Sequence, residues 1–449
     1  MNKEGKKGKR NLSQGVVGNL TTTMILLPLG VLLSIVMARM LGPYGRGVYA
    51  YAALFGDTFF PLIMLGSSTG VFYYISSEKY DVRKVALTAL SMGITNGITF
   101  GFIVYFLWTN QWLGSIAKEL DISVILPILM TMPLTGIIWM SRQLFQGTAL
   151  FNTLNKIELT KFLSKFLLLL IFVSILGWDV KGAIIALAIE DIISAIVVLI
   201  VIYRAFHPQF TYQPQFVKDA YIFGIRSWVG TIGGRANDKL DQILLGSMVK
   251  PESLGYYSNA YALLRFLSFG SNAVAPVLFK KIAKLDDINK SAVLTTQVHR
   301  ILFYSVAILA LLIGLSAPWL IPVLYGESFR FSVLPLQIML PGAVLFATTR
   351  RTISKFMTAN GLNLYASYIQ IVGAITGLGL YLYLIPRYDF IGAAIATTLA
   401  SVISTLFAMG LFYKTAGSEI FRFFILKKED FIWLKNRLFE GIPFLKNRI

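Results

Sequence analysis

The chain has 449 residues, of which 56% are hydrophobic and only 14% are charged, and its formal net charge is +19. This composition is far more apolar than that of a soluble domain, and the lack of cysteine excludes disulfides, thiolate metal sites and cysteine nucleophiles. The positive charge does not indicate nucleic-acid binding, because the basic residues mostly fall between apolar stretches, as expected for orientation signals and contacts with anionic membrane lipid.

Long apolar stretches recur along the whole chain. Each is long enough to cross a bilayer as a helix and too long for a barrel strand, so we predict an all-α polytopic membrane protein with about twelve transmembrane helices. In chain order the predicted spans are residues 14–40, 44–76, 86–108, 123–146, 159–176, 182–203, 220–248, 255–279, 293–315, 332–358, 365–385 and 392–413. The first twelve residues are polar and basic, and the first apolar stretch exceeds a signal-peptide core, so this stretch is expected to remain as a span.

Lysines and arginines are unevenly distributed between the two sets of connections. The N-terminal segment, the connections after the even-numbered spans and the C-terminal tail hold most of them, including Lys156 and Lys161 beside the fifth span. The opposite connections hold about one each, with Arg39 and Arg46 near the first of them. This asymmetry predicts that both termini are cytoplasmic.

Two signatures each occur once in either half of the chain. Pro43-x-x-x-Gly47-x-Tyr49-x-x-Ala52 matches Pro251-x-x-x-Gly255-x-Tyr257-x-x-Ala260, and Asp179-x-x-Gly182-Ala183-x-Ile185-Ala186 matches Asp389-x-x-Gly392-Ala393-x-Ile395-Ala396. We interpret the chain as two copies of one six-helix unit, a frequent architecture of alternating-access carriers.

The predicted domains follow from this duplication. An N-terminal six-helix bundle covers residues 1–204, a cytoplasmic linker 205–219, a C-terminal six-helix bundle 220–413 and a basic cytoplasmic tail 414–449. Aromatic and aliphatic residues among the basic ones of the tail favour an amphipathic helix on an anionic membrane surface. A poorly ordered basic tail is the alternative, because the apolar residues are only loosely periodic.

Ionisable residues inside spans are costly and tend to face a cavity or one another, so they are the candidate functional residues. The candidate substrate-binding cations are Arg235, Arg265, Arg226, Arg142 and Arg350, and the candidate coupling carboxylates are Asp57, Asp191, Asp238 and Asp241. Several of the arginines, like Arg300, lie close enough to a span end for their side chains to reach water, so anchoring is the alternative role. The carboxylates have a structural alternative, which is neutralising neighbouring cations such as Lys239.

The seventh span holds the highest density of charge. Arg235 precedes Asp238 and Lys239 by three and four residues, which places an ion pair and a further cation on one helix face. Arg226 would point away from Arg235 on a regular helix. Because Gly230, Gly233 and Gly234 lie between them and glycine disfavours helix, we expect a bend or local unwinding that turns both arginines toward one cavity.

No pattern predicts a metal site or a cofactor. The chain has two histidines, His207 and His299, and neither has carboxylates at ligand spacing, so both are interpreted as structural residues near helix ends. A cavity with mostly positive charge suits an anion, and guanidinium groups would hold a phosphate or diphosphate through directional hydrogen bonds.

The motifs resemble those of bacterial polysaccharide-synthesis membrane proteins, the oligosaccharide flippases. The resemblance lies in Ala38-Arg39-Met40-Leu41-Gly42-Pro43-Tyr44-Gly45-Arg46-Gly47 with Tyr49, and in Asp238-x-x-Asp241-x-x-Leu244-Leu245-Gly246 followed by Gly255-Tyr256-Tyr257. It implies membership of the superfamily that includes multidrug exporters and the peptidoglycan-precursor flippase. It also implies two six-helix bundles that move an undecaprenyl-diphosphate-linked oligosaccharide to the outer face of the membrane.

The leading functional hypothesis is therefore a flippase for an anionic lipid-linked oligosaccharide that works by alternating access, with H⁺ or Na⁺ as a candidate coupling ion. A multidrug antiporter of the same superfamily is the first alternative, although its cationic drugs would favour a cavity dominated by carboxylates. A membrane glycan polymerase is the second alternative. It is disfavoured because the outer connections are short and no nucleophile with a base, metal cluster or phosphate-binding glycine loop is evident, so we expect no enzyme.

Overall fold

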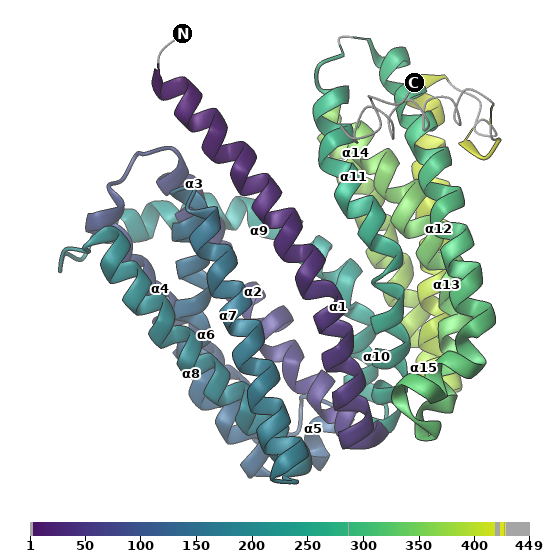
Figure 1. The fold of residues 1–449 in the computed structure, drawn as a ribbon, viewed down its shortest axis with the longest axis horizontal. Helices are drawn as coiled ribbons and strands as arrows, with labels where there is room; N and C mark the ends of the chain where they lie inside the picture. The colour runs from purple at the N-terminus through teal and green to yellow at the C-terminus, as the bar shows by residue number, and fades with distance from the viewer. Residues whose placement is uncertain (1–2, 286, 418–422, 426, 428–449) are drawn as a thin grey trace, which may run out of the picture. The chain divides into compact units, whose positions relative to one another are not determined.

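The fold consists of long helices (Figure 1). The computed structural model describes residues 3–285, 287–417, 423–425 and 427, with side chains outside 3–27, 229–237 and 273. Among these residues there is no strand. The predicted all-α fold is confirmed, and each predicted span has a helical counterpart.

By packing, the chain divides into two units. Unit 1 comprises residues 1–259, 321–332 and 385–390, and unit 2 comprises residues 260–320, 333–384 and 391–449. This division follows contacts, whereas the predicted boundary at 205–219 follows the sequence duplication and stays a prediction.

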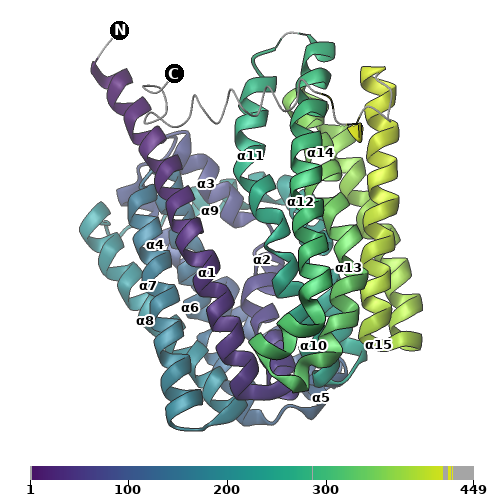
Figure 2. The same cartoon turned by 45° about the vertical axis from the view of Figure 1, so that its right-hand side comes forward.

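Unit 1 holds the helices of the first seven predicted spans. They are α1 (Lys3–Leu54), η1 (Phe55–Phe59), α2 (Phe60–Ile63), α3 (Ser67–Ser76), α4 (Val82–Thr109), α5 (Ser115–Glu119), α6 (Ile122–Gly147), α7 (Phe151–Leu169), η2 (Leu170–Ile175), α8 (Asp179–Phe206), α9 (Pro214–Met248), most of α10 (Pro251–Leu264) and η3 (Glu327–Ser332). In both ribbon views α4, α6, α7 and α8 run side by side (Figures 1 and 2).

Unit 2 is a bundle of five helical segments. They are α11 (Leu267–Ile282), α12 (Ile288–Tyr325), α13 (Val333–Leu345), α14 (Arg351–Ala359) and α15 (Asn363–Ala416), with η4 (Phe346–Arg350) joining α13 to α14. Figure 2 shows them running alongside one another in green and yellow. The last turn of α12 and residues 385–390 of α15 belong to unit 1.

A local interaction explains where α6 begins. The Asp121 carboxylate caps α6 by accepting hydrogen bonds from the Ser123 hydroxyl at 2.7 Å and the Ile122 amide at 2.8 Å. These bonds, with Lys181 at 3.7 Å, hold the pKa of Asp121 below its usual value. The paired aspartates of the second signature, Asp179 and Asp389, both have positive φ, 44° and 55°, so the two copies of the motif share an unusual backbone conformation.

The first signature forms an interface between its own two copies. Gly42 has a φ of 63° and bends α1 just before Pro43. A Cβ on Gly47 would lie 1.7 Å from the carbonyl oxygen of Pro251, and a Cβ on Gly255 would lie 2.0 Å from that of Pro43. Only glycine allows this approach, so the repeated Pro-x-x-x-Gly residues bring α1 and α10 into backbone contact, each copy on the other.

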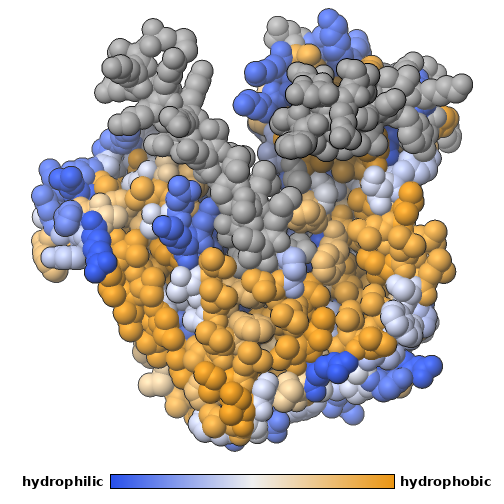
Figure 3. Space-filling model, viewed as in Figure 1, coloured by the Kyte–Doolittle hydropathy of each residue, from blue (hydrophilic) through white to orange (hydrophobic). Residues whose placement is uncertain are grey.

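The lengths and apolarity of the helices fit a membrane protein. Seven helices are long and apolar enough to cross a bilayer, or eight if the bent pair α10 and α11 counts as one span. Two of the seven each contain a pair of predicted spans joined at Gly42 or Asp389. With the bent pair counted, the two predicted spans without a counterpart among these helices correspond to α7 and α9, both of which carry charged residues within the predicted span. Apolar side chains cover the middle of each unit's visible surface, with polar ones toward its ends (Figure 3).

A short stretch after α15 is anchored in unit 2. His299, which is fully buried, lies 3.0 Å from the Phe423 carbonyl oxygen through Nδ1 and 2.9 Å from the Thr349 hydroxyl through Nε2. The Phe423 ring packs against Phe412 and His299, with centroid distances of 4.7 and 4.8 Å. His299 is thus a structural residue as predicted, but it lies inside the helix bundle rather than near a helix end. The remaining predicted tail lies largely outside the described residues.

Candidate functional site: a charge cluster and a cationic bundle

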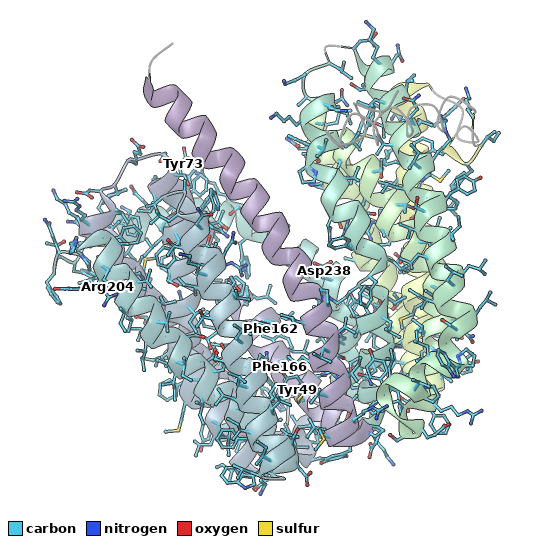
Figure 4. The ribbon with its side chains drawn as sticks, in the orientation of Figure 1. Tyr49, Tyr73, Phe162, Phe166, Arg204 and Asp238 are labelled. Carbon is cyan, nitrogen blue, oxygen red and sulfur yellow. The ribbon has the colours of Figure 1, made fainter. Side chains whose placement is uncertain are left out.

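Helix α7, the counterpart of the fifth predicted span, supplies two lysines to the interior of unit 1. Lys161 and Lys165 are four residues apart on α7 and therefore share a face. Phe162 and Phe166 of the same helix pack into the hydrophobic cluster that holds α7 against α1 and α8. Figure 4 shows both rings beside Tyr49 of α1. Apolar packing along α7 thus fixes where the two ammonium groups lie.

Helix α8, the counterpart of the sixth predicted span, provides the partners of Lys161. The Lys161 Nζ lies 3.7 Å from Oε1 of Glu190 and 3.8 Å from Oδ1 of Asp191, near the middle of α8. Ser194 donates a hydrogen bond to Glu190 at 2.8 Å, and Thr135 of α6 donates one to Asp191 at 3.1 Å. Glu190 is 2% exposed, so its ionised form depends on these partners.

The second lysine links the cluster to α1 and η1. Lys165 lies over the Tyr49 ring, with its Nζ 5.8 Å from the centroid. Asp57, in the π-helical turn η1, is close enough to interact electrostatically with both lysines. Single π-helical turns inside α-helices are often found at functional sites. We call Asp57, Lys161, Lys165, Glu190 and Asp191 the acid–lysine cluster.

The formal charges of the acid–lysine cluster do not balance. Three carboxylates face two ammonium groups, which leaves one negative charge in excess if all five groups are ionised. Charged groups at membrane depth are stable mainly when paired. The cluster therefore suits the uptake of one additional positive charge, a proton or a monovalent cation. Among the described residues, no group of three or more His, Cys, Asp or Glu could hold a metal ion.

The described helices of unit 2 lack acidic side chains. Its helical segments, 260–282, 288–320, 333–384 and 391–416, contain no aspartate or glutamate. Arg300 and Arg350 are each 4% exposed, so neither reaches water as the anchoring alternative requires. Arg350 donates a hydrogen bond to the Gln370 side-chain oxygen at 2.6 Å, and its guanidinium lies 4.8 Å from the Phe346 ring centroid.

Three of the other candidate cations have described side chains. Arg142 pairs with Glu158 at 3.4 Å. Arg226 is exposed on α9, and Arg265 is exposed at the break between α10 and α11. The side chain of Arg235 lies outside the described residues. Their roles as substrate contacts stay predictions.

One feature predicted for the seventh span differs in the structure. The α-helix α9 continues without interruption through Gly230, Gly233 and Gly234, so of the two predicted alternatives the local unwinding is wrong, and the bend stays a prediction. Helical hydrogen bonds evidently outweigh the roughly 1 kcal/mol that each glycine costs. Asp241 accepts a hydrogen bond from the Tyr257 hydroxyl at 2.7 Å, and Lys239 donates one to the Gln242 side-chain oxygen at 3.1 Å.

The remaining candidate carboxylate, Asp238, is exposed on α9 (Figure 4).

The two arginines near the connection between the first two predicted spans, Arg39 and Arg46, make structural hydrogen bonds in addition to marking orientation. Arg46 is partly buried and donates to the side-chain oxygens of Asn259 at 3.1 Å and Ser34 at 3.3 Å. Arg39 donates to the Leu324 carbonyl at 2.8 Å, near the end of α12. Both arginines therefore hold helices of unit 1 together.

The sequence interpretation missed the lysines of the acid–lysine cluster. Lys161 was grouped with the basic residues of a cytoplasmic connection, and Lys165 was not considered. The available signal was their spacing, because two lysines one helical turn apart inside an apolar span have the same significance as the intramembrane acids.

Comparisons with known proteins define the class of this fold. A lipid II flippase, MurJ, in an inward closed conformation superposes with a TM-score of 0.71 at 16% identity, covering 94% of this chain and 96% of that one. A multidrug resistance MATE family transporter of the MOP superfamily gives 0.61 in an inward-facing form, at 15% identity over 89% of this chain and 96% of that one. An outward-facing MATE structure gives 0.57, at 15% identity over 90% and 96%. The chain thus has the fold of this superfamily.

The sequence defines the family more narrowly. Residues 12–285 match the polysaccharide biosynthesis protein family, and the chain belongs to it. An uncharacterized membrane protein of Methanocaldococcus jannaschii is 23% identical over 479 residues, covering 98% of this chain and 91% of that protein. The resemblance inferred from the motifs is confirmed.

Proposed function

We propose that the protein is a flippase that moves a lipid-diphosphate-linked oligosaccharide across the cytoplasmic membrane by alternating access. The family is one of polysaccharide biosynthesis, and the shared fold includes relatives solved in inward and outward conformations. The observation that carries the proposal is the separation of charge: unit 2 has buried arginines and no acid in its described helices.

This separation of charge suits an anionic substrate. Buried guanidinium groups are costly in a medium of low dielectric, and a diphosphate offers them charge-assisted hydrogen bonds. Arg350 and, from the sequence, Arg235, Arg265, Arg226 and Arg142 contact the diphosphate during transport. The hydrocarbon tail remains in lipid while the sugars cross a wet interior. Both termini face the cytoplasm, with the basic connections on the same side.

The acid–lysine cluster provides the coupling. A ligand drives a conformational change only if it binds the two states differently. Uptake of one proton or Na⁺ by the carboxylates would remove the excess negative charge near α7 and α8, changing the attraction of Lys161 for its partners. Asp57 and Asp191 are the carboxylates assigned to this step, and Glu190, as the most buried acid of the cluster, joins them.

The proposal is tested with protein reconstituted into liposomes that contain a fluorescent lipid-diphosphate oligosaccharide. Appearance of the sugar at the opposite face is measured by its quenching with an impermeant reagent. Arg350→Gln and Asp191→Asn should slow transfer strongly, whereas Lys118→Gln, a cation outside both regions, should not. Normal transfer by both variants, at normal levels in the membrane, would contradict the proposal.

A multidrug antiporter is the second candidate, favoured by the three carboxylates of the acid–lysine cluster. Carboxylates attract cationic drugs, and MATE transporters share the fold. The two candidates differ in their cargo. Resistance to cationic drugs, measured beside cell-surface glycan in cells that express the chain, separates them, because only the antiporter confers resistance without a change in glycan.

A further inference from the structure

The loop between α8 and α9 exposes an aromatic ring almost completely. We call this segment, residues 207–213, the linker loop. Phe210 is 95% exposed, the highest value among the large hydrophobic side chains of the described residues, and Tyr212 is 66% exposed. In membrane proteins, aromatic side chains outside the packed interior gather at the boundary between lipid and water. The linker loop is therefore a candidate surface for contact with lipid.

Hydrogen bonds to α4 fix the course of the linker loop. The Gln209 amide donates to the Arg83 carbonyl at 2.8 Å, and the Thr211 hydroxyl donates to the Lys84 carbonyl at 3.0 Å. Between these two bonds, the Thr211 amide donates to the Gln209 carbonyl at 2.8 Å and closes a three-residue turn with Phe210 at its centre. The residues on both sides of Phe210 are thus bonded to the protein, so the exposure of the ring is a fixed feature of the loop.

The length of α8 places the linker loop at the surface of a bilayer. α8 has 28 residues and is the most apolar of the candidate spans. At 1.5 Å per residue it is about 42 Å long, which is the thickness of a bilayer together with its head-group regions. The helix ends at Phe206, and His207 follows with a positive φ of 43°. The linker loop therefore begins at the level of the lipid head groups.

Exposed cations flank the linker loop. Arg83 and Lys84, whose carbonyls bind the loop, are exposed, and so is Arg204 in the last turn of α8. Figure 4 shows Arg204 at the edge of unit 1, and Figure 3 shows hydrophilic side chains at that edge. Residues 203–213 contain no aspartate or glutamate. Asp81, the acid nearest in sequence to Arg83, caps α4 by accepting a hydrogen bond from the Arg83 amide at 3.0 Å.

This combination of an apolar ring and cations fits an anionic lipid surface. Aromatic rings enter the boundary between head groups and acyl chains, while lysine and arginine attract the phosphates above it. A soluble protein partner would have to cover Phe210 and its flanking cations at the level where head groups already lie. The membrane needs no such displacement, so it is the occupant that the position of the loop favours.

We propose that the linker loop is a binding site for anionic phospholipid head groups. The Phe210 ring enters the membrane surface, and Lys84 and Arg204 contact lipid phosphates. Because the loop is hydrogen-bonded to the start of α4, the attachment holds the adjoining ends of α4, α8 and α9 at the membrane surface. The site does not depend on the cargo, so its failure and the failure of the proposed function are separate results.

The absence of cysteine from the chain allows a single labelled position to be chosen freely. Gln209→Cys places an environment-sensitive dye next to Phe210. Gln111→Cys is the matched control, because it places the dye beside Trp112, which is 69% exposed in a connection, residues 109–114, without lysine or arginine. The full-length protein is reconstituted into vesicles of phosphatidylcholine with or without phosphatidylglycerol. Phosphatidylglycerol should shift the emission of the dye at 209 to shorter wavelength and shield it from acrylamide, without changing the dye at 111.

Charge removal measures the contribution of the cations. In detergent, the readout is the phosphatidylglycerol concentration that gives half of the shift of the dye at 209. Lys84→Gln and Arg204→Gln should each raise this concentration about fivefold, which corresponds to about 1 kcal/mol for one cation near an anionic surface. Phe210→Ser should raise it as well. Lys118→Gln, which removes an exposed cation of unit 1 outside the loop, should leave it unchanged. Each variant is first checked for an unchanged melting temperature without added lipid.

Three results would overturn the proposal. A dye at 209 that acrylamide quenches equally in both kinds of vesicle would leave the loop to a soluble partner. An equal response of the dye at 111, or equal effects of Lys118→Gln and Arg204→Gln, would show a general effect of anionic lipid instead of binding at the linker loop. A full shift produced by soluble glycerol phosphate would replace the membrane surface by a free phosphate as the ligand.

Discussion

Replacing Gly47 by alanine tests the contact between the two copies of the Pro-x-x-x-Gly signature. The new Cβ would lie 1.7 Å from the Pro251 carbonyl oxygen and 2.5 Å from its carbonyl carbon. Because these are backbone atoms, no side chain can move aside, and α1 and α10 must separate by roughly 1.5 Å to restore van der Waals contact. Overpacking of this kind typically costs about 1–3 kcal/mol.

The helical preference of alanine acts in the opposite direction. Gly→Ala inside a helix gains up to about 1 kcal/mol, which the control Gly379→Ala should show, because no atom lies within 4 Å of its Cβ position. Relative to this control, Gly47→Ala should destabilise the protein by about 2 kcal/mol or more. Gly255→Ala should behave alike, because its Cβ would lie 2.0 Å from the Pro43 carbonyl oxygen.

Thermal unfolding in detergent, followed by intrinsic fluorescence, measures these differences. The double variant should lose less stability than the sum of the single variants, because both substitutions separate the same pair of helices. A Gly47→Ala protein as stable as Gly379→Ala would refute the inference that backbone contact at this position holds α1 to α10.

Three further predictions concern ion pairs and packing. Lys161→Gln should destabilise unit 1 by more than the ~1 kcal/mol of a surface pair and less than the ~3–5 kcal/mol of a fully buried one, and adding Glu190→Gln should restore part of the loss, as measured by denaturant unfolding. The Asp219 carboxylate accepts hydrogen bonds from Tyr80 at 2.7 Å and Lys79 at 3.3 Å, which lower its pKa. The stabilisation from Asp219 should therefore be complete above the ordinary aspartate pKa of about 4 and disappear as the pH falls through the lowered pKa, measured as the difference in melting temperature from Asp219→Asn. Phe423→Ala should lower the stability of unit 2 by about 3–5 kcal/mol, measured by thermal unfolding, because the ring is 1% exposed.

Control variants and contradicting results make these predictions decisive. Phe407→Ala, at 36% exposure on α15, should cost much less than Phe423→Ala. Lys156→Gln removes a charge from the exposed side of α7 and should leave stability nearly unchanged. A melting-temperature difference between wild type and Asp219→Asn that persists unchanged to the lowest pH would contradict the pairing with Tyr80. Additive losses for Lys161→Gln and Glu190→Gln would show that the two residues are not coupled.

Apolar length and repeated motifs were sufficient to predict the helical fold, because a span in lipid has few alternatives to a helix. They did not predict how side chains converge. The sequence identified Asp57 and Asp191 as intramembrane acids. Their proximity to Lys165 and Lys161 depends on how η1, α6, α7 and α8 pack together, and spacing along one segment does not determine that packing. Local unwinding at Gly230, Gly233 and Gly234 is not found for a different reason, since local preference is weaker than the sum of helical hydrogen bonds.

The reciprocal contact of Gly47 with Pro251 and of Gly255 with Pro43 has an evolutionary consequence. In a duplicated chain the two halves are free to diverge wherever each packs only against itself. Here a larger residue in one half collides with the backbone of the other, so neither half can drift alone. This mutual dependence fits the recurrence of the Pro-x-x-x-Gly signature in the two halves of the sequence.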